Sequence, residues 1–383
     1  MKSIHQLDAR TARAQKIRHF LYMIVFVVVF SIALSLYSQV RYHRSAAATV
    51  AEFDLRLLLA SQDQNELTKK LTGMLEEGKT TYEIPSYILF DSQLEIRRHE
   101  YGESSMQVFH LLPSPEVKPG SSDTVIYYLH GGSYMDEPNP FHWETLDQLC
   151  QETGYEVIVP DYPMIPFDDA ESSYPLVYTH YTHLIDENPE RRVILMGDSA
   201  GGGYCLGLVA FLEGLAYLPE QSQSYELFTP KTRPAYLPDQ LILLSPWVDV
   251  TMDNPEIAEY MDNDPMLKKD QLELCGLLWA GSRPPADPLI SPLYAFEGTA
   301  GTDDRLMASQ RILSRNFPKT LIFTGTREIF YPDIMELYRC LDSIGCDVTL
   351  SVGEGMNHVW VVYPIPEGEE AVQQIESFIQ EDQ

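Results

Sequence analysis

The sequence is poor in cysteine and in basic residues, and each shortage narrows the class of protein. Its 383 residues include five cysteines, and no two of them form a CxxC pair. An odd and scattered set in so long a chain argues against a disulfide scaffold. Lysine and arginine total 27 against 56 acidic residues, which gives a formal net charge of −29. Because a field of that sign repels phosphate backbones, we do not expect nucleic acid as a partner.

Hydrophobic residues are abundant, and one run of them is long. They make up 44% of the chain, which is enough to bury a sizeable core. Phe20–Val40 carries no formal charge, and a helix of that length crosses a hydrocarbon core of roughly 30 Å. More basic residues precede this run than follow it, which places residues 1–19 in the cytoplasm and the rest outside. We expect a single-pass anchor at 20–40; the alternatives are a cleaved signal peptide and a buried core helix.

The segment after the run has helical periodicity. Residues 47–77 mix apolar and charged side chains as one or two amphipathic helices do, and Gly78 ends the pattern. We therefore assign residues 41–83 to a helical linker and cap. Residues 84–383 form the main α/β domain in this interpretation.

Strand and helix patterns alternate through the main domain. Because strands that alternate with helices of 10–15 residues form parallel βαβ units, we predict a mostly parallel sheet with helices on both faces. The expected strands are 94–98, 106–112, 124–129, 156–160, 192–196, 240–244, 320–323 and 347–352. The expected helices are 141–153, 174–187, 202–215, 269–279, 333–343 and 368–380.

The strongest chemical signal is the pentapeptide Gly197–Gly201, which fits the pattern G-x-S-x-G. It follows the expected strand 192–196, and an apolar helix is expected directly after it. Strand, tight turn and helix together are the setting of a nucleophile elbow, which lifts a serine hydroxyl above the sheet. The alternative is a plain glycine-rich turn between a strand and a helix. We expect Ser199 to be a nucleophile.

A serine nucleophile needs a general base, and the base needs an acid that orients it. In this arrangement the partners follow the serine in the order acid, then histidine. His358 is the only histidine after the pentapeptide, and it follows the last expected strand. Two carboxylates qualify as the acid, Glu328 on a loop after a strand and Asp333 at the head of the next helix. We favour Glu328, because Asp333 fits a helix N-cap region.

Attack on an ester builds negative charge on the carbonyl oxygen, and preorganised backbone N–H groups must stabilise that charge. The sequence HGGSY at 130–134 follows an expected buried strand, which is where such donors belong. Glycines let the backbone approach a ligand closely. We expect the amides of Gly131, Gly132 and Ala200 to form an oxyanion hole, and His130 to brace the loop. A simple turn is the alternative.

Together these residues fall in seven ordered blocks that resemble the hormone-sensitive-lipase-like branch of the α/β-hydrolases. The resemblance covers roughly residues 84–380 and implies an α/β-hydrolase fold, carboxylesterase or acyl deacetylase activity, and the site residues given above. It also implies that the N-terminal helices cap the site and that residues 264–281 line the acyl side of the pocket. Ser133 departs from a third glycine, and Pro163 departs from an arginine that is common in the family. The blocks are HGGSY at 130–134, PDYPMIP at 160–166, GDSAGG at 197–202, LSPWVDV at 244–250, DPLISPLYA at 287–295, GTREIF at 325–330 and MNHVW at 356–360.

The expected function is therefore cleavage of short- to medium-chain carboxylic esters through an acyl-enzyme intermediate on Ser199. The alternatives are an amidase or an N- or O-deacetylase on the same residues, and a non-catalytic ligand-binding protein on this fold. No metal or organic cofactor is expected. The expected partners are a small acyl-ester substrate and a membrane, with the catalytic domain outside the cytoplasm. A homo-oligomer is compatible with the sequence.

Overall fold

An eight-stranded sheet forms the centre of the computed structural model, which describes residues 2–59, 66–91, 95–102, 106–114, 116–117, 123–216, 236–296 and 317–381. The strand order is β1-β2-β4-β3-β5-β6-β7-β8. Strand β2 pairs antiparallel with β1 and with β4, and all other neighbours are parallel. The predicted mostly parallel sheet is confirmed. The strands are β1 (Glu95–Tyr101), β2 (Met106–Leu112), β3 (Thr124–Leu129), β4 (Glu156–Asp161), β5 (Arg192–Asp198), β6 (Gln240–Leu244), β7 (Lys319–Gly325) and β8 (Val348–Gly353).

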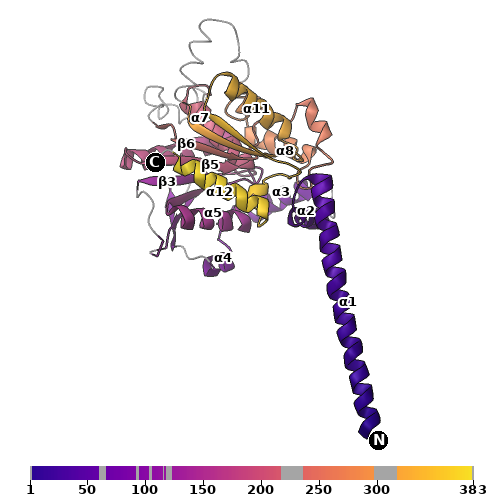
Figure 1. Cartoon of the computed structure of the whole chain (residues 1–383). Helices are drawn as coiled ribbons and strands as arrows, with labels where there is room; N and C mark the ends of the chain where they lie inside the picture. The colour runs from indigo at the N-terminus through magenta and orange to yellow at the C-terminus, as the bar shows by residue number, and fades with distance from the viewer. Residues whose placement is uncertain are drawn as a thin grey trace.

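Helices cover both faces of this sheet (Figure 1). Side chains alternate across a strand, so Tyr127 of β3 joins the core on one face while Ile126 and Tyr128 join the core on the other. The face of Tyr127 packs against α6 (Ala170–Glu187), α7 (Ser199–Leu212), α8 (Lys269–Ala280) and α11 (Tyr331–Ser343). The opposite face packs against α5 (Pro140–Thr153) and α12 (Pro366–Gln380). This two-sided burial explains why the central strands are apolar throughout.

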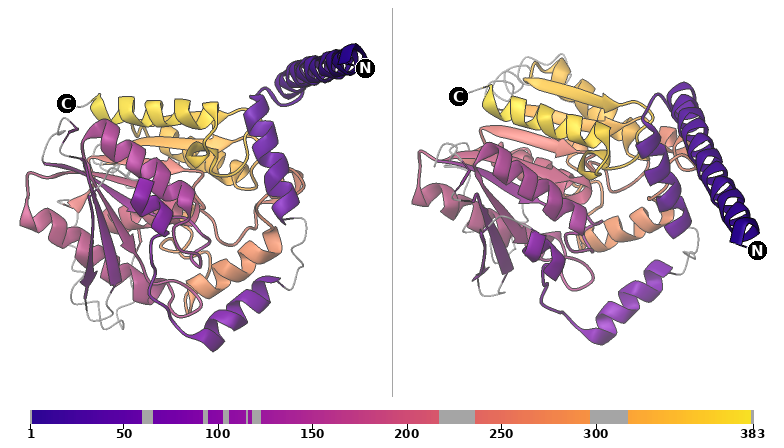
Figure 2. Two further views of the ribbon diagram at one scale, coloured as in Figure 1. Left: turned by 90° about the horizontal axis from the view of Figure 1, so that it is seen from below. Right: turned by 60° about the horizontal axis from the view of Figure 1, so that its bottom comes forward.

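A long N-terminal helix, α1 (Lys2–Tyr42), projects from this body (Figure 1). Its segment Tyr22–Tyr42 is long and apolar enough to cross a membrane, and only 6% of that segment is buried. Two shorter helices follow, α2 (Ala46–Leu59) and α3 (Glu66–Glu77). Both lie on the face of the body that looks toward the N-terminal end of α1, and α3 runs beside α8 (Figure 2).

Most of the helices begin earlier than the sequence-based prediction, and two of these differences concern candidate site residues. Helix α7 begins at Ser199, three residues earlier than expected, because β5 passes into it with no loop between them. Helix α11 begins at Tyr331, with Phe330 as its N-cap residue, so Asp333 lies inside the first turn and does not cap the helix. Hydrophobic periodicity marks the buried face of a helix, but it does not locate the first turn.

Candidate active site

Ser199 occupies the turn between β5 and α7. It is buried, and its φ of 50° is unusual for a residue with a side chain. The flanking glycines are required by close contacts: a Cβ on Gly197 would lie 2.6 Å from the Gly201 carbonyl oxygen. A Cβ on Gly201 would lie 1.9 Å from the carbonyl oxygen of Leu129 in β3. The pentapeptide therefore forms the sharp turn that the sequence predicts.

His358 and Glu328 form one hydrogen-bonded chain with this serine. Nε2 of His358 lies 2.9 Å from Oγ of Ser199, and Nδ1 lies 2.8 Å from Oε2 of Glu328. Oε1 of Glu328 accepts hydrogen bonds from the Gly325 amide (2.8 Å) and from the Thr324 hydroxyl. The side chains of Ser199, His358 and Glu328 are all buried. Because the carboxylate accepts the proton on Nδ1, the imidazole presents Nε2 to the serine as an acceptor.

Asp333 lies outside this chain. Its Oδ1 accepts a hydrogen bond of 2.7 Å from Nδ2 of Asn254, next to a 3-10 turn at Pro255–Glu259. The sequence offered Glu328 and Asp333 as candidates for the acid, and in the structure it is Glu328 that contacts the His358 imidazole.

The predicted oxyanion-hole assignment of Gly131 is wrong. Its amide already donates a 2.7 Å hydrogen bond to Oδ1 of Asp198, so it is not free to bind a substrate oxygen. Gly132 and Ser133 have positive φ angles of 124° and 55°, and both line the cavity beside Ser199. In the described part of the chain, neither of their amides donates to another protein group.

Asp198 is a residue of the site that sequence reasoning missed. It is buried, and besides Gly131 its carboxylate accepts hydrogen bonds from the Tyr128 hydroxyl (2.6 Å) and from Nε2 of His142 (3.1 Å). Burial alone would raise its pKa, but the His142 imidazole and these hydrogen bonds hold the pKa at about 2. Its position inside the pentapeptide Gly197–Gly201 could have marked it as a site residue. Its carboxylate joins the turn of the pentapeptide to residues 130–134, which we call the glycine loop.

A cavity of about 490 Å³ opens beside Ser199 and His358. Its walls are mainly apolar and come from α3, from α8 and the turn before it, and from the loops after β3 and β8. A cavity of this size accommodates a small organic ligand. The apolar wall residues include Leu59, Leu67, Met135, Met266, Leu267, Leu272, Val359 and Val362.

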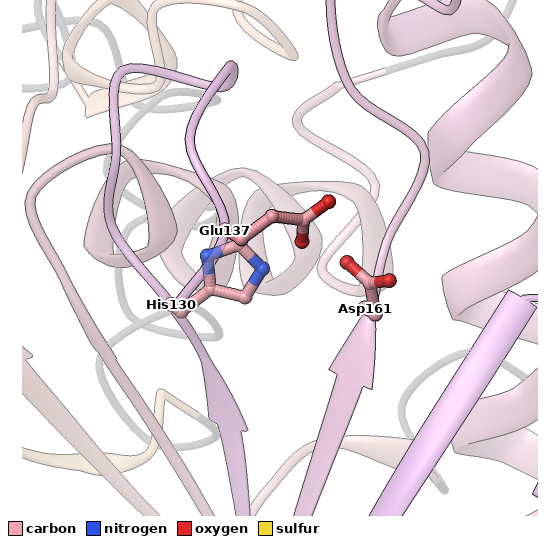
Figure 3. Close-up of side chains that lie close together, drawn as sticks. All are labelled: His130, Glu137 and Asp161. Atoms are coloured by element: carbon pink, nitrogen blue, oxygen red, sulfur yellow. The ribbon is translucent and has the colours of Figure 1, made fainter. Parts of the chain in front are cut away.

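Behind the glycine loop, His130, Glu137 and Asp161 bring one nitrogen and two carboxylates within 4.8 Å of one another (Figure 3). Nδ1 of His130 lies 2.8 Å from the carbonyl oxygen of Gly131, to which it donates, and the ring stacks on Tyr162. The predicted bracing role of His130 agrees with these contacts. A set of this composition could hold a divalent cation. Burial and the contact with Asp161 raise the pKa of Glu137 to about 9, so a shared proton also allows the two carboxylates to lie together.

Curated proteins that are similar to this chain are named as esterases, lipases and acetyl hydrolases. An esterase of Acinetobacter venetianus is 24% identical over 269 residues, which cover 69% of this chain and 77% of that protein. Steryl acetyl hydrolase 1 of Saccharomyces cerevisiae is 25% identical over 198 residues, which cover 49% of this chain and 42% of the yeast protein. The human hormone-sensitive lipase is 25% identical over 57% of this chain and 18% of its own length.

Solved structures share the fold of this protein, and a family profile shows to which protein family it belongs. A putative esterase from Staphylococcus aureus superposes with a TM-score of 0.65 at 25% identity, covering 84% of this chain and 94% of that one. An esterase of the bacterial hormone-sensitive lipase family gives 0.65 at 23%, covering 88% and 98%. The profile described as alpha/beta hydrolase fold matches residues 126–362, more than half of the chain. The predicted resemblance is confirmed: the chain belongs to the α/β-hydrolase family, as a hydrolase of the carboxylesterase and lipase type.

Proposed function

We propose that this protein hydrolyses carboxylic esters through a covalent acyl-enzyme on Ser199. His358 takes the hydroxyl proton through Nε2 while Oγ attacks the ester carbonyl. His358 then gives that proton to the leaving alcohol, and a water molecule activated by the same imidazole releases the acid. Glu328 keeps the imidazole in the required tautomer and stabilises its charged form.

The observation that carries this proposal is the unbroken chain from Glu328 through His358 to Ser199, with contacts of 2.8 and 2.9 Å. Both distances are within the reach of proton transfer without rearrangement. A non-catalytic binding protein on this fold would have no need to keep all three groups buried and aligned. The structure thus favours the enzyme over the ligand-binding alternative.

We assign the oxyanion hole to the amides of Gly132, Ser133 and Ala200. The first two line the cavity next to the nucleophile. The third belongs to the first turn of α7, whose amides have no carbonyl partner within the helix. In this assignment the three amides donate hydrogen bonds to the ester oxygen where it becomes negative.

The proposed substrate is an ester with a short to medium acyl chain and a lipid-soluble alcohol. The cavity volume of about 490 Å³ and its apolar walls suit such a molecule. The yeast relative is named a steryl acetyl hydrolase, and a relative from Mycobacterium tuberculosis is named a putative acetyl-hydrolase. The apolar helix Tyr22–Tyr42 supplies a membrane anchor, which keeps the site near lipid-soluble compounds. In the proposed orientation residues 1–19 are cytoplasmic and the catalytic domain is outside, because more basic residues precede the apolar helix than follow it.

Rates of hydrolysis across p-nitrophenyl esters from acetate to palmitate test the proposal. We expect kcat/KM to be highest between acetate and octanoate and to fall for longer chains as the cavity fills. The matched p-nitroanilides separate an esterase from the amidase and N-deacetylase alternatives: comparable rates on esters and anilides would overturn the ester assignment. The absence of turnover on every ester would overturn the enzyme itself.

A further inference from the structure

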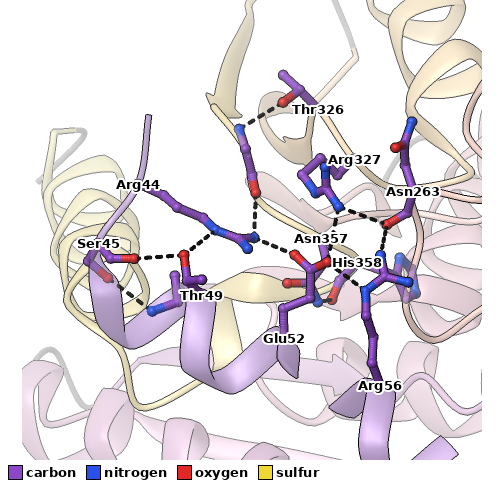
Figure 4. Close-up of polar contacts among 12 residues, drawn as sticks. Arg44, Ser45, Thr49, Glu52, Arg56, Asn263, Thr326, Arg327, Asn357 and His358 are labelled. Carbon is purple, nitrogen blue, oxygen red and sulfur yellow. Dashed lines mark hydrogen bonds and ion pairs between the residues drawn. The ribbon is translucent and has the colours of Figure 1, made fainter. Parts of the chain in front are cut away.

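The chain segment that leaves α1 contacts the two loops that carry Arg327 and His358 (Figure 4). Arg44, two residues after α1 ends, is buried despite its charge. Its Nη1 donates a 2.7 Å hydrogen bond to the carbonyl oxygen of Gly355 and lies 2.7 Å from Oε2 of Glu52. Gly355 precedes His358 by three residues, so the guanidinium holds the start of the histidine loop.

Glu52 of α2 is the centre of this cluster. It is buried, and its carboxylate contacts the guanidinium groups of Arg44, Arg56 and Arg327 at 2.7, 2.8 and 3.0 Å. Burial by itself would raise the pKa of Glu52, but the three guanidinium groups lower it overall. The carboxylate is therefore ionised at neutral pH. Removing its charge would leave three cations facing one another with partners missing.

Arg327 connects this cluster to the acid, because it is the residue before Glu328. Its amide donates to the carbonyl oxygen of Met356 at 3.0 Å, which cross-links the acid loop to the histidine loop. A second cross-link joins the Gly355 amide to the Thr326 hydroxyl at 2.8 Å. The two loops thus form one unit, and Glu52 and Arg44 attach that unit to the segment after α1.

The last residue of α1 packs against the same unit. The guanidinium of Arg327 lies 4.8 Å from the centre of the Tyr42 ring, and that of Arg44 lies 4.6 Å from it. A Cβ on Gly355 would lie 1.8 Å from the Tyr42 carbonyl oxygen, so the histidine loop approaches the end of the helix as closely as a backbone can. From the other side, Arg56 donates to the carbonyl oxygen of Asn263 at 2.7 Å.

We propose that Glu52 and Arg327 are positioning residues for the proposed reaction: through Arg44 and Gly355 on one side and Glu328 on the other, they set the distance between acid, base and nucleophile. The inference rests on the proposed function, and it gives the end of α1 a second task besides attachment. Neither Glu52 nor Arg327 lines the cavity beside Ser199. Their loss should therefore slow the chemical step and leave substrate binding unchanged.

The test uses the full-length protein in detergent and compares Glu52→Gln with wild type. The readouts are the second-order rate of Ser199 labelling by a fluorophosphonate, kcat and KM on p-nitrophenyl butyrate, and Tm. We expect labelling and kcat to fall about tenfold to hundredfold, as misplacement by less than 1 Å does, while KM changes less than twofold. Glu83→Gln is the matched control, because Glu83 pairs with Arg98 on the exposed surface. It should leave the labelling rate, kcat and KM at wild-type values.

A second variant covers the case in which Glu52→Gln does not fold. Arg327→Lys loses the planar group that contacts both Glu52 and the Asn263 carbonyl oxygen, so we expect kcat to fall. Because lysine keeps the positive charge, the loss of kcat should be smaller than in Arg327→Ala. If folded Glu52→Gln or Arg327→Lys labels at the wild-type rate and only Tm falls, the cluster is merely structural and the proposal is overturned. If folded wild type is not labelled, the proposed function fails, and this inference fails with it.

Discussion

Four buried carboxylates, those of Asp198, Asp264, Glu328 and Asp333, differ in the groups that they contact. Glu328 faces an imidazole, whereas Asp198 faces the glycine-loop amide and a second imidazole. Asp264 accepts hydrogen bonds from the amides of Met266 and Leu267, which line the cavity, and from the amide of Ile329, the residue after Glu328. Asp333 contacts an asparagine amide. Only Glu328 contacts a group that also contacts the nucleophile.

A pair of substitutions tests this division. Glu328→Gln presents an amide to Nδ1 of His358 and no longer fixes the tautomer, so we expect kcat to fall by about 10³–10⁴. Asp333→Asn keeps an oxygen that accepts the Asn254 hydrogen bond, so it should leave kcat within about threefold of wild type, and its loss of a negative charge from the first turn of α11 should lower stability by about 0.3–1 kcal/mol. Steady-state kinetics and thermal unfolding on both variants decide. A large loss of kcat in Asp333→Asn with normal kinetics in Glu328→Gln would reverse the assignment.

The pair of Glu137 and Asp161 makes stability depend on pH. The pKa of Glu137 is raised to about 9 in the folded protein, against roughly 4.3 in an unfolded chain. The unfolded state therefore binds fewer protons between these values, and the contribution of this group to stability falls as pH rises from about 4.5 to 9. Glu137→Gln should raise Tm relative to wild type at pH 8 and change it little at pH 4.5. A Tm that drops by the same amount at both pH values would contradict this interpretation.

The sequence allowed us to predict which residues belong to the candidate site, but not the directions in which their backbone amides point. The residue types and their order in the sequence pointed to Ser199, His358 and Glu328, and these three side chains are hydrogen-bonded to one another in the structure. The predicted availability of the Gly131 amide was wrong, because that amide donates to Asp198, 67 positions away, in a loop where Gly132 has a positive φ. Neither quantity is visible in a sequence.

At the scale of secondary structure, the strands were predicted well because they are buried runs bounded by turn residues. Strands β2, β3 and β6 have the bounds that the sequence predicts. The start of α7 was missed because a strained turn, and not a capping side chain, begins that helix. The contacts of α2 were beyond prediction, since Glu52 and Arg327 are 275 residues apart.

Two glycine substitutions test how the elements pack. Gly201→Ala would place a methyl group 1.9 Å from the β3 carbonyl oxygen, so we expect α7 to shift and stability to fall by about 3 kcal/mol. Gly73 lies in α3, and a methyl group added there would meet no atom within 4 Å, so Gly73→Ala should raise stability by about 0.5–1 kcal/mol. Thermal unfolding in one detergent measures both. Equal effects would show that the tight approach of β3 and α7 is absent.

At the scale of the whole molecule, two of the helices that line the cavity lie on the side of the body toward which α1 projects. Helices α2, α3 and α8 lie on the face that looks along α1 toward its N-terminal end (Figure 2). Helices α3 and α8 also contribute walls to the cavity. Exposed apolar side chains continue from α1 onto α2, where Val50, Phe53, Leu57 and Leu58 point into solvent. If Tyr22–Tyr42 crosses a bilayer, as proposed above, these apolar side chains of α2 lie on the helix that follows the anchor.

Membrane attachment gives a direct prediction. After lysis the wild-type protein should sediment with membranes and resist extraction by alkaline carbonate, and its intact mass should include the N-terminal segment. The double substitution Val27→Lys with Val28→Lys should release the protein from the membrane or prevent its insertion, because each charge at the bilayer centre costs about 3 kcal/mol. Val27→Leu with Val28→Leu is the control. Wild-type protein in the soluble fraction would contradict the anchor, and a mass that lacks residues 1–40 would indicate a cleaved signal.

Covalent labelling tests the central claim most directly. Full-length protein treated with a fluorophosphonate should gain the mass of one adduct, and peptide mapping should place that adduct on Ser199. Ser199→Ala should gain none, and His358→Ala should react at least about a hundredfold more slowly because the base is missing. Folded wild-type protein that gains no adduct, or that carries it on another residue, would contradict the account.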